Sequence, residues 1–491
     1  MSDQPSVTRS IGIIGAGPGG ICTGIKLLEA GYDSFTIFDR APGVGGTWFH
    51  NTYPGCACDI PSALYSFSFE LKRDWSRPYG TQPEIRAYFE HCVEKYGLGP
   101  HLQLSTGIVS AHWDDDAARW HVTTEHGDEH EFEVLVGAVG LFGEPVVPDI
   151  PGLETFGGTM FHSARWDHDH DLTGERVAVI GSAASAVQFV PAIAPDVAEL
   201  HVFQRTPNWV MPKEDTPYTE EQLEHLRSDP EAIVALRKEI FERIDPAITF
   251  SNPAMVAASE GLARDNLAQV EDPDVRARLT PTFTHGCKRP LISSDWHPAF
   301  NRDNVELVTD AIERVTPDGI VTADGVTRSV DTIVLATGFS TTKYLGAIDV
   351  VGRGGTALAD AWEGGAHAYL GITTSRFPNL FMLYGPNTNN GSILYMIEAQ
   401  VDYVMRQLAR MDADGLAWID VRPEVEEEYN TRLQADLDAV EVWQVSCNNY
   451  YRAENGRIVT QWPHSMSEYR EWTSRPDADA YEVGTLAPAD R

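Results

Sequence analysis

The sequence has few cysteines, few lysines and no long hydrophobic run. Six cysteines among 491 residues are too few for a disulfide-stabilised scaffold, and the pair Cys56 and Cys58 lacks a second pair or a histidine cluster to complete a zinc site. We therefore expect reduced packing thiols, no bound metal and a cytoplasmic protein. The polar first ten residues predict no signal peptide, and the lack of 18 consecutive apolar residues predicts no membrane span.

Positive charge is also scarce, since 37 Lys and Arg face 72 Asp and Glu and give a formal net charge of −35. This balance excludes a general binder of nucleic acid or anionic membranes, because such partners need a basic face. It leaves room for a local basic pocket that holds one small anion. The length predicts two or three domains, and 42% hydrophobic residues are typical of a globular chain.

The first informative pattern is a candidate dinucleotide cradle near the N-terminus. A short apolar run at 11–14 leads directly into a G-x-G-x-x-G turn at Gly15, Gly17 and Gly20, then into a helical pattern and a second apolar run that ends at Asp39. The glycines allow a tight turn, close approach of a pyrophosphate and close helix–strand packing, while the acid suits a ribose hydroxyl. This order of elements predicts a resident FAD.

A second cradle follows with different chemistry at its strand end. An apolar run leads into Gly181, Ser182 and Ser185, and the next strand ends at Arg205 and Thr206 with no acid. An arginine at this place suits the dianionic 2′-phosphate of NADP through paired hydrogen bonds. We therefore expect a visiting NADPH at the second cradle.

Proline-rich segments and helical patterns predict how the chain is divided. Thr219 with Gln222 forms a candidate capping box, and Asp229 and Pro230 a candidate N-cap and first helical residue, so a helical insertion begins here. The predicted fold is α/β, with two Rossmann-like dinucleotide-binding domains (FAD and NADP) and a helical insertion in the NADP domain. The predicted ranges are 1–145 and 346–491 for the discontinuous FAD domain, 151–218 and 284–345 for the NADP domain, and 219–283 for the insertion.

The segment between the cradles carries a fingerprint. Phe156, Gly158, His162, Trp166 and Asp167 fit F-x-G-x-x-x-H-x-x-x-W followed by Pro or Asp. This pattern, flanked by two Rossmann motifs, resembles the type I Baeyer–Villiger monooxygenases, which are class B flavoprotein monooxygenases related to the flavin-containing monooxygenases. The resemblance covers about residues 10 to 465. It implies that the fingerprint links the domains rather than transferring protons.

The resemblance implies an NADPH- and O2-dependent oxidation of ketones. In such enzymes NADPH reduces bound FAD, the flavin captures O2 as a C4a-peroxyflavin, and one oxygen atom is inserted next to a ketone carbonyl to give an ester or lactone. The protein positions groups and excludes water around this chemistry. The implied partners are a small-molecule ketone and O2, with no obligate protein partner.

The resemblance also assigns roles to individual residues. Arg289 matches the active-site arginine, whose permanent charge stabilises developing anions, and Asp59 matches the aspartate that orients it at the flavin. Lys288 matches the lysine that joins Arg205 at the 2′-phosphate. Further cofactor contacts are expected at Thr47, Trp48, Tyr65 and Met396.

The sequence departs from the family pattern at several positions. The middle glycine of the second cradle is Ala183, Trp296 and His297 stand where many relatives have two tyrosines, and residues 447–451 lack an expected tryptophan. Tyr450 is the candidate substitute for that tryptophan near the nicotinamide.

Three other functions compete with this hypothesis. The runner-up is a heteroatom oxygenase of the same superclass, acting on amines or sulfides, but the fingerprint and Arg289 favour ketones. A pyridine-nucleotide disulfide reductase needs a C-x-x-C or C-x-x-x-x-C beside the flavin, and the spacing of Cys56 and Cys58 is wrong. A flavin-binding sensor has little use for a second cradle.

Overall fold

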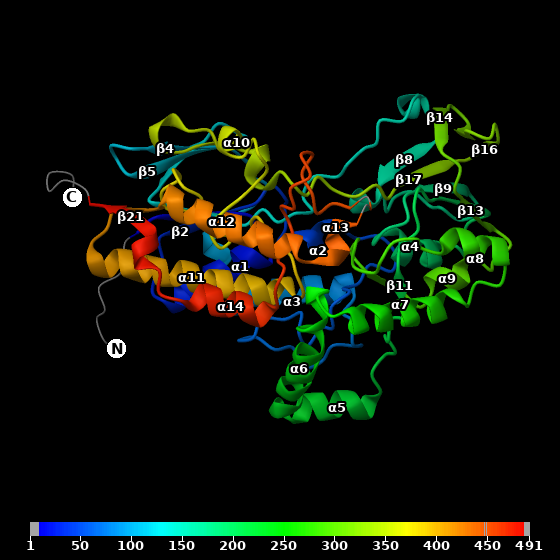
Figure 1. The fold of residues 1–491 in the computed structure, drawn as a ribbon, viewed down its shortest axis with the longest axis horizontal. Coiled ribbons are helices and arrows are strands. Elements are labelled where there is room, and N and C mark those ends of the chain that lie inside the picture. Colours follow the sequence, from blue (N-terminus) through cyan, green and yellow to red (C-terminus); the bar gives the residue numbers. More distant parts are fainter. Residues whose placement is uncertain (1–8, 446, 448, 486–491) are drawn as a thin grey trace.

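The protein contains two five-stranded sheets, and the strands within each sheet are parallel (Figure 1). The computed structural model describes residues 9–445, 447 and 449–485. The first sheet has the order β19 (Leu380–Met382), β7 (Val134–Gly137), β1 (Ile11–Ile14), β2 (Phe35–Phe38) and β3 (Leu102–Gln103). The second has the order β13 (Val305–Val308), β10 (Glu199–Phe203), β9 (Arg176–Ile180), β17 (Thr332–Leu335) and β8 (Thr159–His162). The predicted α/β class with two Rossmann-like cores is confirmed.

Each sheet is built from buried apolar strands, as parallel sheets covered on both faces require. All four residues of β1 and of β7 are buried, and β1 pairs in parallel register with both β2 and β7. Strand β19 joins the edge of this sheet although the whole second sheet intervenes in the sequence. The chain therefore returns to its first unit after the second is complete.

Smaller sheets flank the two cores. Their strands are β4 (Ile108–Asp114), β5 (Arg119–Thr124), β6 (Glu129–Phe132) and β18 (Asp349–Val351); β14 (Ile312–Thr316), β15 (Gly319–Thr322) and β16 (Thr327–Ser329); β11 (Val210–Met211) and β12 (Leu291–Ile292); and β20 (Trp418–Val421) and β21 (Tyr481–Gly484).

The helices divide between the two lobes of Figure 1. Those of the first lobe are α1 (Pro18–Glu29), α2 (Thr47–His50), α3 (Gln82–Lys95), α10 (Leu358–Ala361), α11 (Ile393–Asp414), α12 (Pro423–Asp438), α13 (Glu441–Gln444) and α14 (Met466–Ser474). The others are α4 (Ala186–Ile193), α5 (Glu220–Ser228), α6 (Pro230–Ile244), α7 (Pro253–Leu267), α8 (Pro273–Leu279) and α9 (Trp296–Ala299). In the described residues, no helix is long and apolar enough to cross a bilayer.

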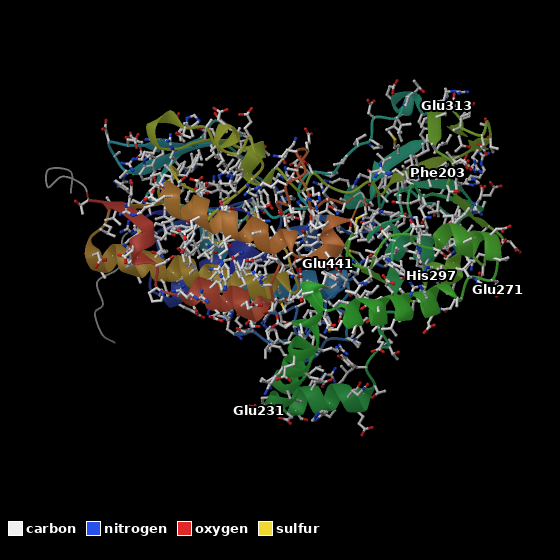
Figure 2. All side chains as sticks on the ribbon, in the orientation of Figure 1. Phe203, Glu231, Glu271, His297, Glu313 and Glu441 are labelled. Carbon is white, nitrogen blue, oxygen red and sulfur yellow. A yellow bond between two sulfur atoms is a disulfide. The ribbon has the colours of Figure 1, made fainter. Side chains whose placement is uncertain are left out.

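The helical insertion begins where its capping residues predict. Thr219 forms the capping box with Gln222, and Asp229 accepts a hydrogen bond from the first turn of α6, so both predictions are confirmed. Helices α5 and α6 project from the body in Figure 1. The excess acid lies outside: Figure 2 shows Glu231, Glu271 and Glu313 at the periphery.

The prediction that all cysteines are reduced thiols is wrong for two of them. Cys287 and Cys447 form a disulfide across 160 residues of sequence, while Cys22, Cys56, Cys58 and Cys92 are free and buried. Local sequence could not reveal the pair, because only the return of the chain brings the C-terminal loop against residue 287.

Candidate active site

The first cradle lies between β1 and α1. Gly17 is the N-cap of α1, and a Cβ on Gly20 would lie 1.9 Å from the carbonyl oxygen of Gly15, so only glycine fits there. Asp39, at the end of β2, accepts hydrogen bonds from the backbone N–H groups of Ala16 at 2.7 Å and Ala41 at 2.8 Å. Each carboxylate oxygen keeps a free lone pair for a ribose hydroxyl. The open helix N-terminus and this carboxylate fit FAD.

The second cradle lies between β9 and α4. Gly181 has a φ of +117°, and a Cβ there would meet the carbonyl oxygen of Ala336 at 2.3 Å. Ser182 is buried, Ser185 is the N-cap of α4, and Ala183 is exposed on the turn. An alanine is therefore accommodated at the middle position without burying its methyl group.

Two unneutralised cations lie beside this second cradle. The Nζ of Lys288 lies 2.5 Å from the hydroxyl of Thr206, and Arg205 is exposed next to it. Burial, followed by the charge of Arg205, lowers the pKa of Lys288. Within the described residues, neither cation has a carboxylate within ion-pair distance. Two adjacent cations without an acid, in a chain of net charge −35, fit a dianionic 2′-phosphate.

Arg289 and Asp59 form an ion pair between the lobes. The Nε and Nη2 of Arg289 donate to Oδ2 of Asp59 at 3.0 and 2.6 Å, and the two side chains are 34% and 28% exposed. The carboxylate of Asp59 is the main reason that the pKa of Arg289 is raised. The guanidinium is thus permanently charged and fixed from one side, and its Nη1 has no hydrogen-bond acceptor in the part of the chain described.

Two tyrosines, Tyr384 and Tyr450, lie near the ion pair of Arg289 and Asp59. Only Tyr450 is predicted from the sequence. Tyr450 and Tyr384 both lie close enough to Arg289 to contribute to the increase in its pKa. The hydroxyl of Tyr384 donates to Oδ1 of Asn389 at 2.5 Å, and the hydroxyl of Tyr450 is buried without a partner among the described residues. Sequence reasoning missed Tyr384, although it directly precedes the Gly-Pro-Asn motif at 385–387.

The other predicted cofactor contacts lie at three places. The Nε1 of Trp48 donates to the hydroxyl of Tyr65 at 3.0 Å, and both side chains are buried. Thr47 is exposed at the start of α2, whereas Met396 is fully buried in α11. Burial raises the pKa of Tyr65, and the charge of Asp59 contributes, so Tyr65 belongs beside the ion pair.

The fingerprint segment begins just before the edge strand β8, at Phe156, and continues past its end to Asp167. The ring of Trp166 lies 5.1 Å from Phe161 and 5.3 Å from Phe189 of α4, and Phe189 lies 5.9 Å from Tyr53 of the first lobe. This aromatic chain connects the two lobes. The carboxylate of Asp167 accepts from the N–H of Asp169 at 3.0 Å, next to the chain.

The remaining fingerprint residues make contacts close to their own segment. The Nδ1 of His162 accepts from the N–H of Ala164 at 3.1 Å, and burial lowers the pKa of the imidazole. Phe156 is half-buried, and a Cβ on Gly158 would lie 2.2 Å from a carbonyl oxygen of Asp331. None of these side chains touches Arg289 or Asp59 through a hydrogen bond or ion pair in the described residues.

Two segments that depart from the family pattern, residues 296–297 and the loop at 447–451, lie in different environments. Trp296 and His297 are each 2% exposed and pack in α9, so they serve the core of the second lobe. In the C-terminal loop, Asn449 donates to the carbonyl oxygen of Cys287 at 2.9 Å, which holds Tyr450 close to Arg289. Asn448 lies outside the described residues.

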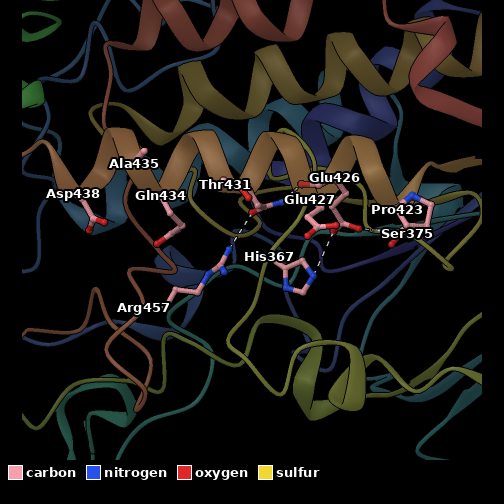
Figure 3. A pocket seen from close by; sticks show the side chains of 11 residues that line it. His367, Ser375, Pro423, Glu426, Glu427, Thr431, Gln434, Ala435, Asp438 and Arg457 are labelled. Carbon is pink, nitrogen blue, oxygen red and sulfur yellow. Dashed lines mark hydrogen bonds and ion pairs between the residues drawn. The ribbon is translucent and has the colours of Figure 1, made fainter.

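A separate cavity of about 630 Å³ lies along α12 (Figure 3). His367, Glu426 and Arg457 lie along it, and Glu426 is held by the hydroxyl of Thr374 at 2.8 Å. No residue of the two cradles or of the ion pair lines this cavity, so it is distinct from the candidate site.

Known proteins resemble the chain over nearly its whole length. A family model described as pyridine nucleotide-disulphide oxidoreductase matches residues 12–250. A Baeyer-Villiger monooxygenase of Pseudomonas aeruginosa is 41% identical over 99% of this chain and 94% of its own length. Cyclohexanone monooxygenase from Rhodococcus sp. Phi1 bound to NADP+ is 32% identical, with a TM-score of 0.87 over 97% of this chain and 99% of its own. OTEMO in complex with FAD and NADP is 27% identical, also with a TM-score of 0.87, over 97% and 99%.

Proposed function

The chain belongs to the Baeyer–Villiger monooxygenase family of FAD- and NADPH-dependent flavoproteins, and from this premise we propose that Arg289 and Asp59 are its catalytic pair. The activity of the family is oxidation by NADPH and O2 that inserts one oxygen atom next to a ketone carbonyl. Bound FAD supplies the redox chemistry, because it accepts hydride from NADPH and activates O2. The protein's own residues bind, orient and stabilise charge around it.

The observation that supports this assignment is the one-sided fixation of Arg289. Asp59 engages Nε and Nη2, which preorganises the guanidinium and leaves Nη1 for another acceptor. A fixed donor pointing at the place where negative charge develops on a ketone oxygen is worth roughly 10²–10³ in rate. Lys288 directly precedes Arg289 in the chain, so the proposed 2′-phosphate site and the catalytic pair are neighbours.

We assign the cofactor contacts by the same logic. Gly15, Gly17, Gly20 and Asp39 bind FAD with help from Thr47, Trp48, Tyr65 and Met396. NADPH binds at Gly181, Ser182, Ser185, Arg205, Thr206 and Lys288. Phe156, Gly158, His162, Trp166 and Asp167 link the domains, which the aromatic chain through Trp166 supports.

The domain ranges follow from the same proposal. FAD binds to 1–145 and 346–491, NADPH to 151–218 and 284–345, and the insertion covers 219–283. The return of β19 to the first sheet supports a discontinuous first domain. We also propose a cytoplasmic location, where NADPH is regenerated, and no obligate protein partner, because every assigned residue comes from one chain.

The test compares Arg289→Ala and Asp59→Asn with the unchanged enzyme. We expect Arg289→Ala to lower ester formation from a panel of ketones by about 100-fold or more while FAD remains bound. Asp59→Asn should lower it less, because the guanidinium stays but loses its fixation. Esters are quantified by mass spectrometry and FAD by absorbance.

The same panel contains amines and thioethers. Unchanged ester yield in Arg289→Ala would contradict the catalytic assignment. Oxygenation of amines or thioethers alone, by the unchanged enzyme, would contradict the ketone as substrate.

A further inference from the structure

One face of α6 fastens the helical insertion to the first lobe. Arg237, Phe241 and Asp245 follow each other at intervals of four residues, so they lie on one side of the helix. The ring of Phe241 lies 4.9 Å from Tyr395 of α11, and Oδ1 of Asp245 accepts from the N–H of Met466 at 2.7 Å. Figure 1 shows α6 running from α5 at the tip of the projection to the body.

Arg237 makes the most extensive of these contacts. Its side chain is 13% exposed, and its Nη1 lies 3.0 Å from the carbonyl oxygens of Ala63 and Leu64 and 2.9 Å from that of Ser66. Burial is the main reason that the pKa of Arg237 is lowered, and the charge of Glu398 opposes this effect.

These carbonyls are available because residues 61–65 form a single hydrogen-bonded turn that does not continue into a helix. The N–H groups of Leu64 and Tyr65 both donate to the carbonyl oxygen of Pro61 at 2.9 Å. The last carbonyls of such a turn have no following N–H groups to accept from, and a buried carbonyl without a partner is costly. The two hydrogens of the Arg237 Nη1 group are shared among three of these carbonyls, and the carbonyl of Leu64 also accepts from the hydroxyl of Ser392 at 3.3 Å.

The turn carries a residue of the candidate site. Tyr65 receives the hydrogen bond of Trp48 at 3.0 Å and lies close enough to Asp59 for the carboxylate to affect its pKa. Arg237 touches neither cofactor cradle nor the catalytic pair. Its effect on them is indirect, and the backbone of the turn is one route.

The same guanidinium also faces α11. Its Nη2 lies 3.9 Å from Oε1 of Glu398, which is 6% exposed and accepts from the N–H of Ser68 at 2.8 Å. Arg470 faces the other carboxylate oxygen of Glu398 at 3.9 Å. Met396 precedes Glu398 by two residues, so Arg237 joins both segments that carry assigned flavin contacts.

We propose that Arg237 is a positioning residue that locks the helical insertion onto the flavin-side turn and so holds Tyr65 and Trp48 in place. The proposal rests on the assignment of these two side chains to the flavin site. Loss of the lock leaves hydride transfer from NADPH intact but misaligns the oxygenating site. The electrons then go to the reaction NADPH + H⁺ + O2 → NADP⁺ + H2O2, in which O2 is reduced by two electrons and no ester forms.

The experiment measures how much oxygen reaches the product in holoenzyme variants. Arg237→Met should lower the ratio of ester formed to NADPH consumed by about 10-fold, with a matching rise in H2O2 and an unchanged KM for NADPH. The visible circular dichroism of bound FAD should change. Arg237→Lys keeps the charge but has one nitrogen in place of two, so it cannot meet the carbonyls of the turn and face Glu398 at the same time, and it should give an intermediate ratio.

Lys238→Met is the matched control, because its side chain is the next one on α6 and is 75% exposed. It should keep both the ratio and the dichroism. If Arg237→Met does not accumulate as folded protein, Arg237→Lys carries the test. An unchanged product ratio and unchanged dichroism in the folded variant would overturn the proposal.

Failure of the proposed function gives a different result. If the unchanged enzyme formed no ester, the ketone assignment would fall. The dichroism of bound FAD in Arg237→Met against Lys238→Met would still decide whether Arg237 positions the flavin site.

Discussion

At the scale of single residues, the proposed NADPH site makes coenzyme choice depend on Arg205 and Lys288, two cations with no acid partner in the described part of the chain. Removing the guanidinium in Arg205→Ala should raise KM for NADPH by about 10- to 100-fold, because a hydrogen bond to a charged group is worth about 1.5–3 kcal/mol. KM for NADH should change little, since NADH has no 2′-phosphate. Steady-state kinetics with both coenzymes measure the difference.

Arg314→Ala provides the control for the loss of one positive charge, because Arg314 lies on β14 and its side chain is 49% exposed. It should leave both KM values unchanged. Equal increases for NADPH and NADH in Arg205→Ala would remove the 2′-phosphate from the explanation.

The sequence could predict those site residues whose role is set by their immediate neighbours in the chain. The glycines of both cradles, Asp39 and Arg205 are recognisable because each stands at a fixed place after a strand. Arg289 and Asp59 are 230 residues apart, so only the family resemblance could pair them. Tyr384 directly precedes a Gly-Pro-Asn motif, but its contacts, like those of Arg237, are set by the fold and not by its sequence neighbours.

At the scale of elements, the strand pair β20–β21 contains a carboxyl group with an unusual protonation equilibrium. Asp420 is 6% exposed and stands opposite Glu482 in the pairing register. Burial raises its pKa to about 7, although the N–H of Arg376 at 3.0 Å and the guanidinium of Arg353 at 3.8 Å oppose the shift. The charge of Glu426 adds to the increase.

The sign of the pH dependence follows from this raised pKa. Between about pH 4 and 7 the folded state keeps a proton that the unfolded state has released. The free energy of unfolding therefore falls by up to about 4 kcal/mol as the pH rises through this range. Asp420→Asn removes this dependence. The variant should match the unchanged protein near pH 4 and exceed its melting temperature at pH 8.

Asp318→Asn is the control, because Asp318 is exposed in a turn. It should follow the unchanged protein at both pH values. Parallel pH curves for Asp420→Asn and the unchanged protein would show that Asp420 does not carry a raised pKa.

The positions of whole helices could be predicted from the sequence more readily than the way in which those helices pack against the rest of the protein. The capping residues Thr219 and Asp229 place the starts of α5 and α6 correctly, because caps act within one turn. The face of α6 that contacts the first lobe carries Arg237 and Asp245. A search for apolar periodicity cannot detect a contact face that is made by charged residues. The hydrophobic periodicity of α6 marks Ile233 and Ile240, which are buried, but it cannot mark Arg237.

At the scale of the whole molecule, the Cys287–Cys447 disulfide ties the two ends of a 160-residue excursion of the chain. A cross-link of this kind restricts the unfolded chain and contributes about 2–4 kcal/mol. Cys447→Ser should therefore lower the melting temperature measured without reductant, and dithiothreitol should lower that of the unchanged protein to a similar value while leaving the variant unaffected. A non-reducing peptide map that recovers both residues as free thiols, or equal melting temperatures without reductant, would contradict the cross-link. Because residue 287 lies two positions before Arg289, the same bond also ties the proposed catalytic arginine to the loop that carries Tyr450.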